Sequence, residues 1–307
     1  MAKKQTVTIS VVVPSYNHEN YVIQAIKSVL AQSLKGVDLI VIDDGSTDGS
    51  GGLIEEFLKK NGGFRFVRRG NRGLIHTLNE GVGMARGDLF CELASDDYLP
   101  PDSLEIRSRP FLNDSGLVAV YGDAISVLDE RVTGQRLTDE KRKKVFYEPD
   151  PVPSLLRATQ PIFATGLFRR DVFIKMGGFD ERFRYYEDLD TPLRLYLEGK
   201  VVFIDRPVLY RREHAANVSG QRTPRLLERI LCYDKFLEDP RLAPYRKIIR
   251  HRLMRTYLAL ARIIDKNKLC GGPERDVLQK GWQFAWMDPR LFYLLLRYGR
   301  RRQHEGG

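Results

Sequence analysis

The chain has 307 residues, of which 42% are hydrophobic and 29% charged, so it is long enough for one large or two modest domains. This ordinary composition excludes disordered and fibrous architectures. The net charge of +10 is uneven, because residues 1–200 hold 27 basic and 29 acidic side chains whereas residues 201–307 hold 23 and 11. The basic last third indicates either an anionic partner surface or a solvated helical face.

Cysteine usage and hydropathy indicate the cellular compartment in which the chain folds. The three cysteines are far apart and fit no metal-ligand spacing, which predicts a reducing environment. No stretch approaches the roughly 20 apolar residues that span a bilayer. The short, Thr- and Ser-interrupted apolar run near the start favours a β-strand over a signal peptide.

Strands alternate with helices through the first half of the chain. Apolar, β-branched runs predict strands at "TISVVVP", "VDLIVIDD", "FRFVRR", "DLFCEL" and "LVAVYGD". Segments with helical spacing separate them, including 21–32 and "GLIHTLNEGVGMARG". This alternation predicts an α/β fold with a mainly parallel sheet and helices on both faces.

The second half is less regular. The polar segment 129–150 has no clear period and is interpreted as a mobile surface loop. Residues 152–205 return to mixed structure and end in a strand at "VVFID". From Arg222 onward the pattern is helical, and composition and charge both shift near residue 220, where we expect a domain boundary.

Polar clusters follow four of the predicted strands. They are "PSYN" (14–17), "DDGSTD" (43–48), "RGNRG" (69–73) and "SDD" (95–97). In such sheets ligands bind at the carboxyl ends of strands, so the four clusters are expected along one edge. Asp, Asn, Gly and Ser also form turns, but four clusters at matching positions favour a binding site.

The residue types at this edge indicate a nucleotide diphosphate with its metal. Asp43 and Asp44 can accept hydrogen bonds from a base or ribose, and Tyr16 offers an aromatic face. Asp96 and Asp97 are hard oxygen ligands that suit Mg²⁺ or Mn²⁺. The P-loop and G-x-G-x-x-G motifs are absent from the sequence, which argues against a P-loop NTPase and gives dinucleotide binding no support.

In combination and order, several motifs resemble inverting glycosyltransferases of family 2. They are "SVVVPSYNHENYVIQAIKSVLAQS", "DLIVIDDGSTDGS", "LNEGVGMARGDLFCELASDDYLPPDSLE", "GLFRRDVFIKMGGFDERFRYYEDLDTPLRLYLEG" and "YRREHAANVS". The resemblance implies a GT-A fold over residues 1–220, with a nucleotide-sugar half (1–122) and an acceptor half (123–220). Residues 221–307 do not carry the family pattern and are expected to form a basic helical extension.

The resemblance also implies donor and metal residues. Those that would hold the nucleotide-sugar are Pro14, Ser15, Tyr16, Asn17, Asp44, Arg72 and Asp96. Asp97 would be the main protein ligand of Mn²⁺ or Mg²⁺, with Asp96 and His214 beside it. Many members read Asp-x-Asp-Asp here, whereas this chain has Ala94 at the first position, which leaves open how Asp96 and Asp97 divide their roles.

The motif "YYEDLD" supplies the expected general base. In the family the aspartate of "ED", here Asp188, removes the acceptor proton, and Glu187 would shape the acceptor pocket. The alternative is an acidic N-cap cluster without a catalytic role. Arg211 and Arg212 either steady the diphosphate or are ordinary surface charges.

The resemblance favours a UDP-sugar donor and a saccharide or lipid-linked acceptor in bacterial polysaccharide, lipopolysaccharide or glycolipid synthesis. We expect a cytoplasmic protein, attached at the inner membrane face if its basic C-terminal helices bind anionic lipid. Those helices alternatively pack on the catalytic domain or form a homo-oligomer. A nucleotidyltransferase lacks its glycine-rich loop here, and a nucleic-acid-binding protein lacks a recognisable module, so both are alternatives of lower rank.

Overall fold

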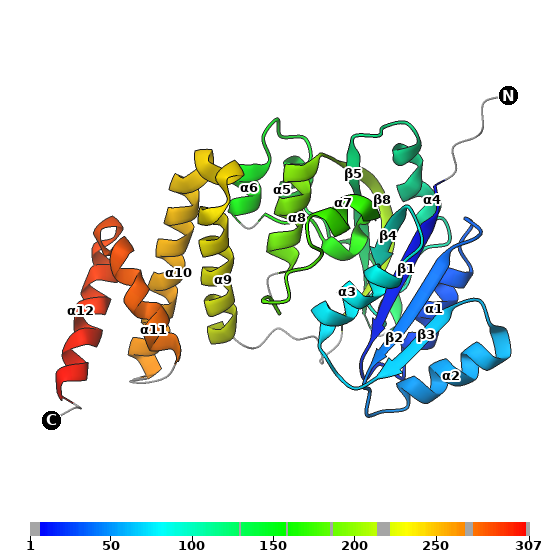
Figure 1. Ribbon diagram of the computed structural model, residues 1–307, viewed down its shortest axis with the longest axis horizontal. Coiled ribbons are helices and arrows are strands. Elements are labelled where there is room, and N and C mark those ends of the chain that lie inside the picture. Colours follow the sequence, from blue (N-terminus) through cyan, green and yellow to red (C-terminus); the bar gives the residue numbers. More distant parts are fainter. Residues whose placement is uncertain are drawn as a thin grey trace. The chain divides into compact units, whose positions relative to one another are not determined.

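The computed structural model describes residues 7–128, 130–157, 159–184, 187–213, 222–267 and 273–304. The chain forms two compact units, shown with all their elements in Figure 1. The first unit contains Met1–Pro151, Thr159–Arg182 and Thr191–Asn217, and the second contains Val152–Ala158, Phe183–Asp190 and Val218–Gly307.

One eight-stranded sheet runs through the first unit. Its strands are β1 Ile9–Ser15, β2 Asp38–Asp44, β3 Arg65–Arg69, β4 Leu89–Glu92, β5 Leu117–Leu128, β6 Arg131–Arg136, β7 Leu167–Arg169 and β8 Lys200–Glu213. The order is β3-β2-β1-β4-β7-β5-β6, with β8 paired to β5. Strands β3, β2, β1 and β4 pair parallel with their neighbours in this order, and β5 pairs parallel with β8. Strand β7 pairs antiparallel with β4 and β5, and β6 pairs antiparallel with β5. The five strands predicted in the first half are all present.

Helices cover both faces of this sheet, as the α/β pattern predicts. The helices of the first unit are α1 Val22–Leu30, α2 Ser50–Asn61, α3 Leu74–Met84, α4 Ser103–Ser108, α5 Glu140–Val145, α7 Arg170–Lys175 and the larger part of α8 Glu187–Glu198. Alternate residues of β1 point to opposite faces. Val11 and Val13 therefore share one core with α1, α2 and α4, while Val12 packs in the other core with α3, α7 and α8.

The second unit is helical. It contains α6 Val152–Leu156, α9 Arg222–Glu238, α10 Arg246–Asn267, α11 Pro273–Lys280, the 3₁₀ segment Gly281–Met287 and α12 Pro289–His304. Tyr233 on α9 donates to the Leu156 carbonyl (2.8 Å), and the Tyr257 ring on α10 stacks on Phe284 (centroids 5.5 Å apart). The C-terminal helices were expected, and the domain boundary near residue 220 stays a prediction. Among the helices that the structure describes, none is both long and apolar enough to cross a bilayer.

The segment 129–150 differs from the expected loop. It forms the edge strand β6, joined to β5 in a hairpin, and the short helix α5, whose Asp139 cap accepts from the Arg142 amide (2.8 Å). All six residues of β6 are exposed, so the strand buries no apolar face. Its sequence therefore lacks the alternation on which a strand prediction depends.

Candidate active site

The polar clusters predicted to line one edge of the sheet do meet there. The parallel strands β1, β2, β3 and β4 lie side by side, and each cluster follows the carboxyl end of its strand. Ser15 at the end of β1 is paired in register with Asp43 at the end of β2. The topology thus brings together the residues expected to hold the nucleotide and those expected to hold the metal.

Asn17 braces the first two loops of this edge against each other. Its backbone is left-handed (φ +54°), a conformation that Asn tolerates better than most residues. Its Oδ1 accepts from the Thr47 amide (2.8 Å), and its own amide donates to Ser46 Oγ (3.0 Å). The neighbouring Tyr16 ring remains 46% exposed, so it is accessible to a base.

Asp44 holds the loop that follows β3. Its buried carboxylate accepts from the amides of Arg72 (2.7 Å, at Oδ1) and Gly73 (2.9 Å, at Oδ2), and it is ion-paired with Arg69. The Arg72 side chain is exposed and lies near His76, with Nη1 and Nε2 3.3 Å apart. Asp44 therefore shapes the loop that carries Arg72, and contact of either residue with a nucleotide stays a prediction.

Two buried oxygen atoms at this edge have no hydrogen-bond partner. They are Ser15 Oγ and Asp43 Oδ2, at the ends of neighbouring strands. The other Asp43 oxygen, Oδ1, accepts from the Ser46 backbone amide (2.8 Å). Gly51 lies against Oδ2, because a Cβ at this position would be only 2.5 Å from that oxygen. Buried polar atoms are normally paired, so an unpaired acceptor here favours a ligand that donates hydrogen bonds. Asp43, adjacent to the predicted Asp44 in sequence, thus becomes a further candidate for binding the nucleotide.

Asp96 and Asp97 occupy the turn after β4, in which the Asp97 amide donates to the Ala94 carbonyl (3.0 Å). Asp97 is only 5% exposed, and its Oδ1 accepts from the Arg212 amide (2.9 Å). Burial, and then the charge of Asp96, raise the pKa of Asp97 to about 7. Asp96 Oδ2 lies 3.9 Å from His18 Nε2. Two close carboxylates, one of them buried, form a site where a cation is favourable.

Arg212 supports this turn from within the protein. Its guanidinium forms a two-pronged ion pair with Glu130 (2.8 and 3.0 Å) and also donates to the Asp96 carbonyl and to Gln24 Oε1. The guanidinium carbon lies over two aromatic rings, those of Tyr21 (5.0 Å) and Tyr98 (4.8 Å). Arg212 is thus neither a surface charge nor directed at a diphosphate, because its donors are used inside the protein.

The donor set at the turn fits a divalent cation. Mg²⁺ and Mn²⁺ usually bind one or two protein carboxylates and complete their coordination with substrate phosphates and water. Asp96 and Asp97 supply two carboxylates, and the third expected ligand, His214, lies outside the described residues. Within the described ranges there is no group of three or more His, Cys, Asp or Glu side chains that could hold a metal ion.

Glu187 and Asp188 lie in the first turn of α8. The Asp188 side chain is exposed, and a helix N-terminus stabilises negative charge there. Both residues are grouped with the second unit, whereas the nucleotide and metal candidates belong to the first. Their assignment as general base and acceptor-pocket residue stays a prediction.

With this geometry described, comparison with known proteins defines the family. Residues 10–177 match glycosyl transferase family 2, more than half of the chain. The chain therefore belongs to glycosyl transferase family 2, as the motifs predicted. It is 34% identical over 214 residues to the chondroitin synthase and to the hyaluronan synthase of Pasteurella multocida, an alignment that covers 69% of this chain. The chain spans 21% of the length of each synthase.

Solved structures share the fold. S. aureus TarS 1-349 in complex with UDP-GlcNAc superimposes with a TM-score of 0.65 at 19% identity, covering 96% of this chain and 88% of that one. A mannosyltransferase from Pyrobaculum calidifontis in complex with GDP-Man and Mn²⁺ gives 0.60 at 16% identity, covering 99% and 89%. These likenesses confirm the expected GT-A-like fold with its C-terminal helices.

We expect Asp97→Asn to stabilise the metal-free protein more at high pH than at low pH. The folded-state pKa of about 7 lies above the ordinary value of 3.8 for an aspartate in the unfolded chain, so the wild type loses stability as pH rises from about 4 to about 7. The side-chain amide of the Asp97→Asn variant does not ionise, so the variant does not lose stability in this way. The difference in Tm between variant and wild type, measured in EDTA, should be larger near pH 8 than near pH 5, with Glu56→Gln on the exposed face of α2 as the control. An equal difference at both pH values would show that Asp97 is not destabilised by burial.

We expect Arg212→Met to lower the free energy of unfolding by about 2–3 kcal/mol. Breaking a buried ion pair costs ~3–5 kcal/mol, and the loss is smaller here because the Glu130 side chain is 61% exposed and can rehydrate. Urea unfolding measures the change, with the exposed Arg206→Met on the same strand as a control expected within about 0.5 kcal/mol of wild type. If Arg212→Met unfolds like the control, Arg212 does not anchor the turn.

Proposed function

We propose that the chain transfers a sugar, with inversion, from a nucleotide-diphosphate donor to an acceptor hydroxyl. The observation that carries the proposal is the edge at which four loops meet, with unpaired buried acceptors at Ser15 and Asp43 beside the Asp96–Asp97 turn. The family assignment points the same way and leaves the nucleotidyltransferase and nucleic-acid-binding alternatives without support.

The chain's own residues divide the donor between them. Residues 14–17, with Asp43 and Asp44, form the base and ribose end, where buried carboxylate oxygens accept from donor N–H and O–H groups. Arg72 lies in the loop that Asp44 fixes and would contact the nucleotide. Complexes of the fold relatives with UDP-GlcNAc and with GDP-Man support a nucleotide-sugar donor, and a UDP-sugar is our preferred choice.

Asp97 and Asp96 would hold Mn²⁺ or Mg²⁺, joined by His214. When bound, the ion would neutralise charge on the departing diphosphate. The Arg212 backbone amide donates to one Asp97 carboxylate oxygen and so fixes the orientation of this ligand. The Mn²⁺ bound with GDP-Man in the mannosyltransferase from Pyrobaculum calidifontis supports a divalent cation.

Asp188 acts as the general base. Inversion requires a carboxylate on the side of the sugar opposite the leaving diphosphate, where it takes the acceptor proton as the oxygen attacks the anomeric carbon. Asp188 is exposed in the first turn of α8, where a helix N-terminus favours a carboxylate. Glu187 beside it shapes the acceptor pocket. The acceptor is a saccharide, free or lipid-linked, in bacterial envelope polysaccharide synthesis, by analogy with the synthases that the chain resembles.

We expect Asp188→Asn to retain donor binding and lose transfer by at least about a hundredfold, because general-base catalysis contributes that much. Asp97→Ala should instead weaken Mn²⁺-dependent donor binding. Thermal shift with UDP-, GDP- and dTDP-sugars, with and without Mn²⁺, measures binding, and release of nucleotide diphosphate measures turnover. Glu198→Gln, at the other end of α8, is the matched control. If Asp188→Asn turns over like the wild type, the base is misassigned.

The second unit carries a surface suited to an anionic membrane. Its exposed aromatic rings lie close together in sequence: Trp282, Trp286, Phe292 and Tyr293, with Trp286 80% exposed. Arg297 and Arg300–Arg302 follow in the same sequence segment. Aromatic rings beside basic side chains are typical of helices that lie in a lipid interface.

We expect the chain to co-sediment with vesicles that contain anionic lipid and not with neutral vesicles. Trp286→Ala with Tyr293→Ala should reduce the bound fraction several-fold, because each exposed ring contributes apolar area. Tyr147→Ala, which removes a 70% exposed ring from the first unit, is the matched control. Equal partitioning of the double variant and wild type would reject this surface, and a concentration-dependent oligomer that the double variant abolishes would assign the rings to a second copy of the chain.

A further inference from the structure

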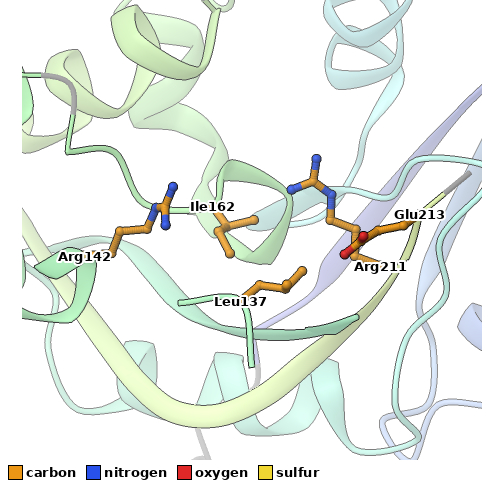
Figure 2. Close-up of a pocket in the computed structure, with 5 residues that line it drawn as sticks. All are labelled: Leu137, Arg142, Ile162, Arg211 and Glu213. Carbon is orange, nitrogen blue, oxygen red and sulfur yellow. The ribbon is translucent and has the colours of Figure 1, made fainter. Parts of the chain in front are cut away.

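A cavity with polar and apolar lining residues lies in the first unit, beside the end of β8. It has a volume of about 300 Å³ and is lined by Leu137, Arg142, Ile162, Arg211 and Glu213 (Figure 2). This volume is at the lower end of the range for ligand pockets, suited to a single sugar residue rather than to a whole nucleotide-sugar. None of these five residues belongs to the nucleotide, metal or base sets assigned above.

Strand alternation on β8 separates this cavity from the metal turn. Successive residues of a strand point to opposite faces. Arg212 is buried toward the Asp96–Asp97 turn, whereas Arg211 and Glu213 are exposed and line the cavity. Arg211 nevertheless adjoins Arg212, whose amide donates to Asp97 Oδ1 (2.9 Å), so the cavity and the turn share the end of β8.

The cavity contains uncommitted hydrogen-bond donors. The structure gives the Arg211 guanidinium no hydrogen-bond or ion-pair partner among the described residues, although Glu213 is only two residues away. Arg142 Nη1 donates to Asp139 Oδ2 (2.8 Å), and its Nε and Nη2 have no hydrogen-bond partner among the described residues. In Figure 2 the Arg142 and Arg211 side chains lie on either side of Ile162. Guanidinium donors that line one cavity favour an anionic group in it.

The remaining lining residues suit a sugar rather than a bare anion. Glu213 accepts from Ser126 Oγ (2.8 Å) through Oε1 and has Oε2 available for a hydroxyl. Leu137 and Ile162 pack against the core and give the cavity an apolar floor. The wall is held in place, since the Leu137 amide donates to the Ala124 carbonyl (2.9 Å) and the Thr138 amide to the buried Asp123 (2.9 Å).

We propose that this cavity, the arginine pocket, binds an acidic sugar residue of the acceptor, with its carboxylate or phosphate held by Arg211 and Arg142 and a hydroxyl held by Glu213. This inference rests on the proposed function, because it identifies the acceptor as a saccharide with an acidic residue. The pocket shares strand β8 with Arg212, whose amide bonds Asp97, and so it lies on the same strand that holds the metal turn.

The test uses ligand-observed NMR titrations of the full chain with methyl glucuronide, glucose 6-phosphate and the neutral methyl glucoside. We expect one or both acidic sugars to bind more tightly than the glucoside, and the stronger of the two identifies carboxylate or phosphate. Arg211→Gln should weaken binding of the acidic sugar about tenfold and Arg142→Gln less, with binding of the glucoside changed little, because the variant loses a hydrogen bond to a charged group. Arg131→Gln, an exposed arginine of β6, is the matched control.

The inference is overturned if neither acidic sugar binds more tightly than the glucoside, or if Arg211→Gln binds the acidic sugar like the Arg131→Gln control. Thermal shift with Mn²⁺ and UDP-sugar on the same samples separates this failure from that of the proposed function. A donor shift without acidic-sugar preference rejects only the pocket, whereas the absence of a shift with any nucleotide-sugar rejects the transferase proposal.

Discussion

The interaction on which the site depends is the burial of the Asp97 carboxylate beside Asp96. Desolvation and like charge both disfavour this arrangement. The protein meets part of the cost through Arg212, whose amide bonds Asp97 and whose guanidinium bonds the Asp96 carbonyl. The turn is therefore a fixed site with two carboxylates, at which a cation that arrives with the substrate is favourable.

The parallel sheet places the rest of the machinery around that turn. Loops that follow β1, β2 and β3 are tied together by side-chain to backbone bonds, with Asn17 joining the first two and Asp44 fixing the third. This bracing leaves Ser15 and Asp43 buried with unpaired oxygens. Side chains alternate between the two faces of β8. Arg212 therefore supports the metal turn while Arg211 lines the arginine pocket, and adjacent residues of one strand serve two different ligands.

Sequence reasoning succeeded where the determinants are local. The strands β1 to β5 are apolar runs bounded by turn residues, and the loops at their carboxyl ends carry the motifs. Sequence reasoning missed β6, which is exposed along its whole length. It also missed the structural role of Arg212, whose amide donates to Asp97, 115 residues away in the sequence. Glu130 and Gln24 likewise contact Arg212 only through the tertiary fold. The arginine pocket gives no motif, because its five residues come from three separate segments.

The most direct test of the central claim is an anomalous-scattering map, recorded at the manganese edge, of crystals grown with Mn²⁺ and a UDP-sugar. The account predicts a peak about 2.0–2.2 Å from a carboxylate oxygen of Asp97 and at similar distance from the donor diphosphate. A bound donor with no peak at Asp97, or with the ion held away from both acidic side chains, would contradict it.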